Sequence, residues 1–206
     1  MTDQLLIIFT RNPEQGKVKT RLAQTIGDEP ALAVYNILLK HTKEVVKDLP
    51  SDKTVYYSSF IDYNDLWDSE KFDKKVQTGN DLGAKMYNAF GDAFQDEYAK
   101  VVLIGSDLID LSAKHIEDAF EALTKNDIVL GPAHDGGYYL IGLKKIYRPI
   151  FENKEWGTST VFQSTMNDLK TENVFLLDEL NDVDTYDDLK AIPQLKDFLL
   201  RHDKTH

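Results

Sequence analysis

The sequence predicts an α/β protein in which a mostly parallel central sheet lies between two layers of helices, as a three-layer sandwich. Segments with the residue pattern of strands alternate along the chain with segments that have the periodicity of helices. Residues 101–104 are four consecutive aliphatic residues, which is typical of a strand buried on both faces of such a sheet. Gly105, Ser106 and Asp107 follow directly, where ligands bind in open α/β sheets.

The predicted strands are short aliphatic, β-branched or aromatic runs bounded by polar residues. They cover residues 5–10, 54–59, 75–77, 101–104, 128–130, 138–143 and 174–177. Residues 62–73 are acidic and aromatic, which indicates a surface loop or a short helix.

The predicted helices carry apolar residues on one face. The first begins near Thr20, and the others cover residues 31–46, 82–94, 116–123, 159–169 and 185–191. Pro30 suits the first turn of its helix. Asp184 is an expected N-cap, with Asp187 and Asp188 in the favourable first turn that follows.

Composition limits the function classes. The 206 residues suit one domain spanning 1–206, and 42% apolar with 29% charged residues is ordinary for a globular protein. The absence of cysteine excludes disulfides, thiolate metal sites and cysteine nucleophiles. The longest apolar run, residues 5–9, is too short to span a bilayer, and no signal-peptide pattern precedes it, so a cytoplasmic location is expected.

The net charge of −11 argues against a general nucleic-acid binder, because a polyanion would be repelled over most of the surface. A nucleotide ligand would therefore need a local positive site. Arg11, Lys17, Lys19 and Arg21 supply one candidate, in a loop that follows the first strand and leads into a helix. Free N–H groups at a helix N-terminus, flanked by cations, favour anions. The spacing matches neither a P-loop nor a dinucleotide fingerprint, and a solvated basic loop is the alternative.

Residues 77–85 form a second polar motif. Gln77 could help to hold a base or ribose, and so could Asp81. A helix cap alone explains Asp81 equally well.

Acidic residues at strand ends form the third group. Asp107 follows the buried strand, and Asp135 lies in a turn with Gly136 and Gly137 between two predicted strands. Turn chemistry alone could explain each of them. If they converge on a ligand, Asp107 and Asp135 with Asp182 would suit a hard cation such as Mg²⁺, and Asp184 could join them.

Two further residues have competing interpretations. Trp156, with the three residues that follow it, could form the acceptor-side wall of a site, but a core tryptophan followed by a helix cap is the more common case. His134 is more often a turn residue than a base, although pairing with Asp135 would raise its pKa.

Five ordered motifs resemble one known family. They are Gly16–Leu22, Gly105–Asp107, Asp135–Gly142, Trp156–Ser159 and Asp182–Thr185. In this order the chain resembles the DUF2064 family of GT-A-like transferases, also called radical-SAM/selenodomain-associated transferase 1. The resemblance implies the fold of the nucleotide-diphospho-sugar transferases.

The same resemblance implies roles for individual residues. Asp107 would be a metal ligand for Mg²⁺ or Mn²⁺, and Lys17, Lys19 and Arg21 would contact phosphates. Asp135 or Asp182 would be an additional metal or acceptor-side residue. Asp107 and Asp135 are thus the predicted catalytic residues.

Three functions remain open from the sequence. A metal-dependent glycosyltransferase would use a nucleotide-sugar donor, as the family's usual naming suggests. A nucleotidyltransferase would move a nucleoside monophosphate, for example a guanylyl group, from a triphosphate to a phosphorylated acceptor, and the cationic loop favours it. A nucleotide-binding protein without catalysis is the third. The expected partners are a nucleotide or nucleotide sugar and a small acceptor.

Overall fold

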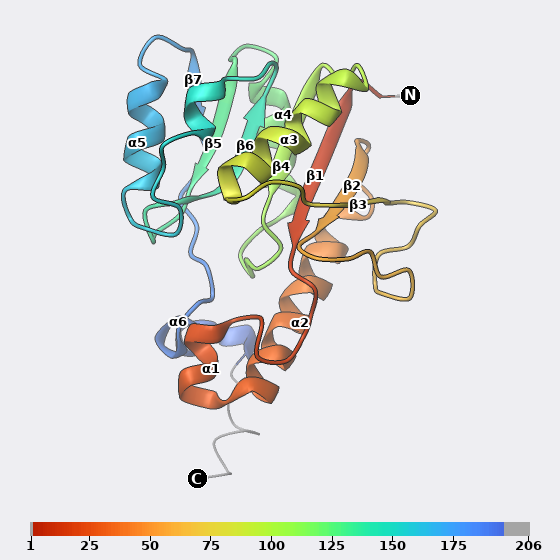
Figure 1. Ribbon diagram of the computed structural model, residues 1–206, viewed down its shortest axis with the longest axis vertical. Coiled ribbons are helices and arrows are strands. Elements are labelled where there is room, and N and C mark those ends of the chain that lie inside the picture. Colours follow the sequence, from red (N-terminus) through yellow and green to blue (C-terminus); the bar gives the residue numbers. More distant parts are fainter. Residues whose placement is uncertain (1, 196–206) are drawn as a thin grey trace.

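The computed structural model describes residues 2–195 and has one seven-stranded sheet within them, in the order β3-β2-β1-β4-β6-β5-β7 (Figure 1). The strands are β1 (Gln4–Thr10), β2 (Asp52–Tyr57), β3 (Asp73–Val76), β4 (Lys100–Ile104), β5 (Ile128–Pro132), β6 (Tyr138–Leu143) and β7 (Val174–Leu176). Only β6, among the described strands, is antiparallel to its neighbours. The predicted mostly parallel sheet is confirmed.

Helices cover both faces of the sheet, which confirms the predicted three layers. The helical elements are α1 (Thr20–Ile26), α2 (Asp28–Val46), α3 (Leu82–Gln95), α4 (Ala113–Ala122), η1 (Arg148–Phe151), α5 (Val161–Asp168), α6 (Tyr186–Ala191) and η2 (Pro193–Leu195). One core joins α2 and α4 to the sheet, and the other joins α3 and η1 to its opposite face.

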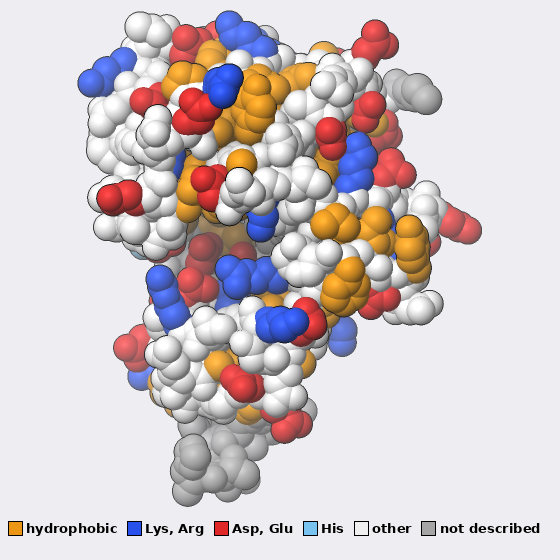
Figure 2. All heavy atoms as spheres, viewed as in Figure 1, with side chains coloured by type: hydrophobic (Ala, Val, Ile, Leu, Met, Phe, Trp, Pro, Cys, Tyr) orange, Lys and Arg blue, Asp and Glu red, His pale blue; other side chains and the backbone are white. Residues whose placement is uncertain are grey.

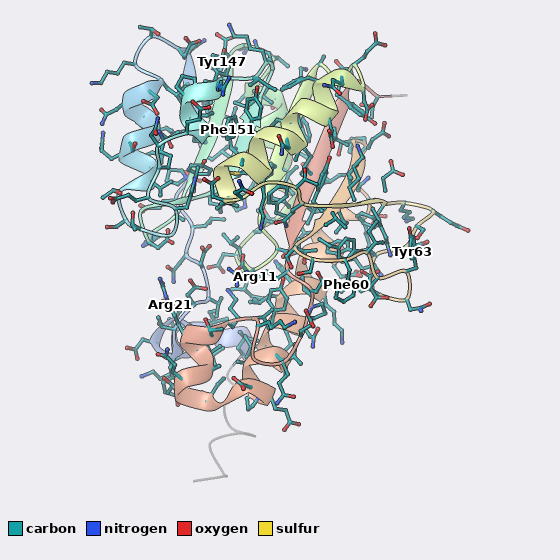
Figure 3. All side chains as sticks on the ribbon, viewed as in Figure 1. Arg11, Arg21, Phe60, Tyr63, Tyr147 and Phe151 are labelled. Atoms are coloured by element: carbon teal, nitrogen blue, oxygen red, sulfur yellow. The ribbon has the colours of Figure 1, made fainter. Side chains whose placement is uncertain are left out.

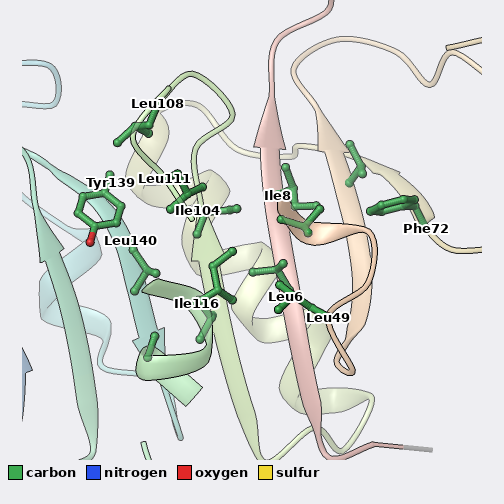
Figure 4. Close-up of a cluster of buried hydrophobic side chains, with 14 of the residues drawn as sticks. Leu6, Ile8, Leu49, Phe72, Ile104, Leu108, Leu111, Ile116, Tyr139 and Leu140 are labelled. Carbon is green, nitrogen blue, oxygen red and sulfur yellow. The ribbon is translucent and has the colours of Figure 1, made fainter. Parts of the chain in front are cut away.

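The alternation of side chains along the strands divides them between these two cores. Leu6 and Ile8 of β1 face the α2 and α4 side, where Ile104 and Leu140 also pack (Figure 4). Ile7 faces the α3 side. The aliphatic run of β4 is buried on both faces, as predicted.

The direction of the strands brings the polar loops to one edge of the sheet. The parallel register pairs Ile8 of β1 with Ile104 of β4, so the loops after both strands leave the sheet at the same level. The turn between β5 and β6, residues 133–137, lies at this edge because β5 is parallel to β4. The edge faces α1, α6 and the first half of α2, which pack in a third apolar cluster (Figure 1).

One local expectation is corrected and another is confirmed with a difference in burial. Thr185, not Asp184, is the N-cap of α6, and its side chain accepts the N–H of Asp188. The predicted loop is present over residues 62–72, before β3 begins, but Trp67 and Phe72 are buried with their rings 5.1 Å apart, edge to face, and join the first core. This loop is therefore fixed to the sheet by its aromatic residues.

Predicted boundaries differ from the observed ones by a few residues. The strand predicted at 54–59 ends at Tyr57, and the helix predicted from residue 159 begins at Val161. Across residues 2–195, the structure contains no helix with the length and apolar character required to cross a membrane.

Two glycines of α3 provide a test of this packing. A Cβ at Gly83 would lie 2.1 Å from the carbonyl oxygen of Phe151 and 2.7 Å from the Trp156 ring, whereas a Cβ at Gly91 would meet only Ile146, at 3.8 Å. Gly83→Ala should therefore lower the free energy of unfolding by about 1–3 kcal/mol through overpacking. Gly91→Ala should raise it by about 0.5–1 kcal/mol, as expected for alanine in a helix interior. Urea unfolding measures both, and equal effects would contradict the close approach of α3 to η1.

Candidate active site

A pocket of about 820 Å³ lies at the edge of the sheet, between the ends of the strands and α1. In the space-filling view it is the hollow across the middle of the molecule, where several blue cationic side chains gather (Figure 2). Arg11 and Arg21, which are labelled in Figure 3, both line this pocket. We call it the larger pocket. The cationic loop that follows β1 forms much of its wall.

Tyr35 of α2 holds the start of this loop. Its buried hydroxyl accepts the N–H of Arg11 at 2.9 Å, donates to the Arg11 carbonyl at 3.1 Å, and lies 3.2 Å from the hydroxyl of Thr10. Asn12 fixes the next position, since its amide donates to the carbonyl of Phe60 at 2.9 Å. The cations of the loop are thus presented on an ordered backbone.

Lys19 is the buried cation of the site. Its ammonium lies 2.8 Å from Asp107 Oδ2 and 2.9 Å from Asp184 Oδ1, and its side chain is 3% exposed. Burial lowers the pKa of Lys19, but the two carboxylates outweigh it and hold the pKa above its ordinary value. Lys19 also has a positive φ of 46°, a conformation uncommon outside glycine. In the structure the ammonium of Lys19 pairs with two carboxylates. The sequence analysis predicts instead that it contacts a phosphate.

Two other cations, Lys17 of the loop and Arg21 in the first turn of α1, are more exposed. Lys17 pairs with Glu14 at 2.9 Å, and its side chain is 68% exposed. Arg21 lies 3.8 Å from Asp184 and is similarly exposed. Exposed pairs of this kind contribute little to stability, so both side chains can turn to a ligand at little cost.

Asp182 is a partly buried acid beside the site. Its Oδ1 is buried and accepts no hydrogen bond from the described residues. Burial, with added repulsion from Asp107, Asp135 and Asp184, raises the pKa of Asp182 to about 8 against the opposing effect of Lys19. The carboxyl therefore holds its proton at neutral pH unless a further cation arrives.

Asp135 occupies the turn between β5 and β6, where its Oδ1 accepts the N–H of Gly137 at 2.8 Å. The turn is locked by Gly136, which has a φ of 85° and whose carbonyl accepts the N–H of Phe162 at 2.9 Å. These contacts hold Asp135 at the wall of the larger pocket.

These acids fit a divalent cation only in part. Within residues 2–195, no three carboxylate or imidazole groups are placed together as a complete metal site. Mg²⁺ commonly takes one or two carboxylates and completes its shell with phosphate oxygens and water. The unpaired oxygen of Asp182 and its repulsion by neighbouring acids are relieved by added positive charge. The arrangement therefore fits an ion that arrives with a polyphosphate.

Most of the predicted site residues come together. Those lining the larger pocket are Arg11, Lys17, Lys19, Arg21, Gln77, Asp107 and Asp135. Asp182 lines a smaller neighbouring pocket together with Asp135. Asp81 lines neither pocket, and its side chain accepts the N–H of Ala84 at 2.7 Å, as in the helix-cap interpretation. Gln77 donates to the carbonyls of Thr10 and Tyr56, which joins the ends of β1 and β2.

Sequence reasoning missed three contributors. Tyr35 occupies an apolar helix position in the sequence, and only the structure shows its hydroxyl under the loop. Ser106 lies 3.2 Å from Thr10 through its hydroxyl, although its place in the Gly-Ser-Asp motif was a signal. Lys85 adds another cation to the larger pocket from the first turns of α3.

Comparison with known proteins gives consistent matches. The family model described as "Uncharacterized protein conserved in bacteria (DUF2064)" matches residues 41–158. A crystal structure of a candidate nucleotide-diphospho-sugar transferase from Desulfovibrio desulfuricans G20 is 32% identical, with a TM-score of 0.87, over 99% of this chain and 96% of that chain.

Two other similarities are weaker in sequence. A 2-phospho-L-lactate guanylyltransferase from Methanocaldococcus jannaschii is 28% identical over 85% of this chain and 76% of its own. The 4-diphosphocytidyl-2C-methyl-D-erythritol synthase from Anaerococcus prevotii is 12% identical with a TM-score of 0.59, over 97% of each chain, and shares the fold.

The raised pKa of Asp182 predicts a pH dependence of stability. The folded protein keeps a proton on this carboxyl up to a pH of about 8, whereas the unfolded chain releases it near 3.8. The stabilisation is thus complete below pH 3.8 and is lost as pH rises towards 8, by at most about 1.4 kcal/mol per pH unit.

Asp182→Asn should remove this slope. Urea unfolding in metal-free buffer, between about pH 5 and about pH 8, should show wild type losing stability relative to the variant as pH rises. Asp178→Asn, a change in the same segment outside both pockets, is the control. Parallel pH profiles for wild type and Asp182→Asn would contradict the buried, protonated carboxyl.

Proposed function

The chain belongs to the DUF2064 family, and we propose that it is a nucleotidyltransferase that moves a nucleoside monophosphate from a triphosphate to a phosphorylated small acceptor. The observation that carries the proposal is the larger pocket, in which Arg11 and Lys17 of an ordered loop gather with Arg21 of α1 in an otherwise acidic chain. The guanylyltransferase similarity supports this reaction class.

The loop cations would hold the β- and γ-phosphates of the donor. An oxygen of the acceptor phosphate attacks the α-phosphorus and forms a new P–O bond. The bond from the α-phosphorus to its bridging oxygen breaks, and its electron pair leaves with pyrophosphate. Arg11, Lys17 and Arg21 would stabilise the charge that develops on this leaving group.

Asp107 and Asp135 are the proposed ligands of a divalent cation, Mg²⁺ or Mn²⁺. Asp182 lines the neighbouring pocket together with Asp135. Such an ion would supply Lewis-acid stabilisation of the phosphate charge when bound. Lys19 would keep Asp107 in place through its ammonium and limit repulsion between Asp107 and Asp184.

A glycosyltransferase acting on a nucleotide sugar is the second candidate. The strong similarity to a candidate nucleotide-diphospho-sugar transferase favours it. It would use the same phosphate loop but would break the sugar–phosphate bond. The two reactions differ in their donor, and the donor therefore decides between them.

Asp107→Asn tests the site. Thermal unfolding of wild type with Mg²⁺ should shift upward on addition of nucleoside triphosphates, since ligand at about 100 times its Kd stabilises by about 2.7 kcal/mol. The variant should lose the Mg²⁺-dependent part of the shift. Asp110→Asn, an exposed acid in the same loop that lines neither pocket, should keep it.

The same panel distinguishes the two reactions. Larger shifts with triphosphates, and pyrophosphate release when phosphorylated acceptors are added, support nucleotidyl transfer. Larger shifts with nucleotide sugars support glycosyl transfer instead. An Asp107→Asn protein that shifts like wild type would remove Asp107 from the site.

A further inference from the structure

A pocket of about 220 Å³ opens beside the larger one, and we call it the smaller pocket. The two pockets share four lining residues: Phe9, Leu82, Asp135 and Gly157. A molecule in the smaller pocket can therefore reach the larger pocket across Asp135 and Gly157. A Cβ at Gly157 would meet nothing within 4 Å, so this point of the shared wall is open.

The chemistry of the two pockets differs. The larger one is lined by five cationic side chains, including Lys85 of α3. Within the described part of the chain, no lysine, arginine or histidine lines the smaller pocket, and its only acidic residues are Asp135 and Asp182. The rest of its wall is mainly apolar and aromatic, including Met86, Leu103, Tyr138, Ile141, Trp156 and Val161.

The wall of the smaller pocket is held by packing within the chain. Trp156 packs against the second core and lies directly on Gly83 of α3, where a Cβ would be 2.7 Å from its ring. The loop after Trp156 is held to the β5–β6 turn, since a Cβ at Gly136 would lie 2.3 Å from the Ser159 carbonyl oxygen. Preformed apolar pockets with few polar groups are typical of small-molecule sites.

We propose that the smaller pocket is the acceptor subsite and that it takes the uncharged, apolar body of a phosphate monoester, aliphatic or aromatic. This assignment rests on the proposed nucleotidyl transfer and names its acceptor class. The acceptor phosphate extends past Asp135 and Gly157 into the larger pocket, where Lys85 lies one turn after Leu82 on α3.

The wall of the smaller pocket disfavours an acceptor with a carboxylate in its body. The similar guanylyltransferase is named after 2-phospho-L-lactate. That compound has a carboxylate on the carbon that carries the phosphate. In this pocket that carboxylate would meet the negative charge of Asp135, and no lysine, arginine or histidine among the described residues lines the wall to pair with it. An unpaired buried charge is strongly unfavourable. An apolar body instead gains by leaving water.

The transfer step balances for such an acceptor. One oxygen of the monoester phosphate forms the bond to the α-phosphorus of the triphosphate. The bond to the bridging oxygen breaks, and pyrophosphate leaves with the electron pair. The product is a nucleoside diphosphate ester of the apolar alcohol, and the transfer needs no oxidant or reductant.

Calorimetric titration of wild type saturated with a non-hydrolysable triphosphate and Mg²⁺ tests the assignment. The probes are phenyl phosphate, n-butyl phosphate, 2-phospholactate and inorganic phosphate. The two apolar esters should bind at least about tenfold tighter than the other two, a difference of about 1.4 kcal/mol. Equal or tighter binding of 2-phospholactate would overturn the proposal.

Val161→Phe provides a matched test of location, because Val161 lines only the smaller pocket and a larger side chain would fill it. It should weaken phenyl phosphate by at least about tenfold. Val45→Phe, the same change on α2 outside both pockets, should not. Unchanged binding to Val161→Phe would place the ester elsewhere and overturn the proposal.

Trp156 gives a second readout that needs no change in the pocket. The chain has two tryptophans, and Trp67→Phe leaves Trp156 as the only one. Phenyl phosphate should alter its fluorescence and 2-phospholactate should not; the reverse would contradict the assignment.

If triphosphates fail to bind wild type, the proposed function is wrong. If they bind but the apolar esters do not, only the acceptor assignment is wrong.

Discussion

The ammonium of Lys19 is the contact on which the rest of the candidate site depends. It joins the loop after β1 to the loop after β4 through Asp107, and to the segment before α6 through Asp184. Without this lysine, the carboxylates of Asp107 and Asp184 would lie close together in a partly buried space with no cation between them. A paired, buried lysine reduces that repulsion, and its burial makes the pairing strong because little water screens it.

The topology explains why these groups meet. Parallel strands deliver the loops after β1 and β4 to one edge, and the reversal at β6 adds the turn that carries Asp135. The chain then returns along this turn, where Leu180 and His134 form a backbone hydrogen bond, and reaches the acids at 182 and 184. Four of the five cations of the larger pocket therefore come from the segment that follows β1, and the acids at 107, 135, 182 and 184 come from later segments.

Local patterns in the sequence predicted the sheet, its buried β4 strand and the gathering of polar motifs at one edge, because burial and strand direction leave a regular signal. They did not predict the pairing of Lys19 with acids 88 and 165 residues away, since such contacts depend on tertiary structure. The helix cap shows the same limit. Asp184 and Thr185 both suit an N-cap, and the attraction of Lys19 for Asp184 leaves the cap to Thr185. The burial of Trp67 and Phe72 was not predicted either, because both lie within an acidic stretch of the sequence.

The free energy of unfolding of Lys19→Met, in metal-free buffer near neutral pH, tests the central role of Lys19 most directly. Lys17→Met is the control, because Lys17 is an exposed lysine of the same loop. Removing the buried cation leaves uncompensated acids, so a loss of about 3 kcal/mol is expected, against at most about 0.5 kcal/mol for the control. Adding Asp184→Asn to Lys19→Met should restore part of the loss. Equal stability of the two single variants would contradict this account of the site.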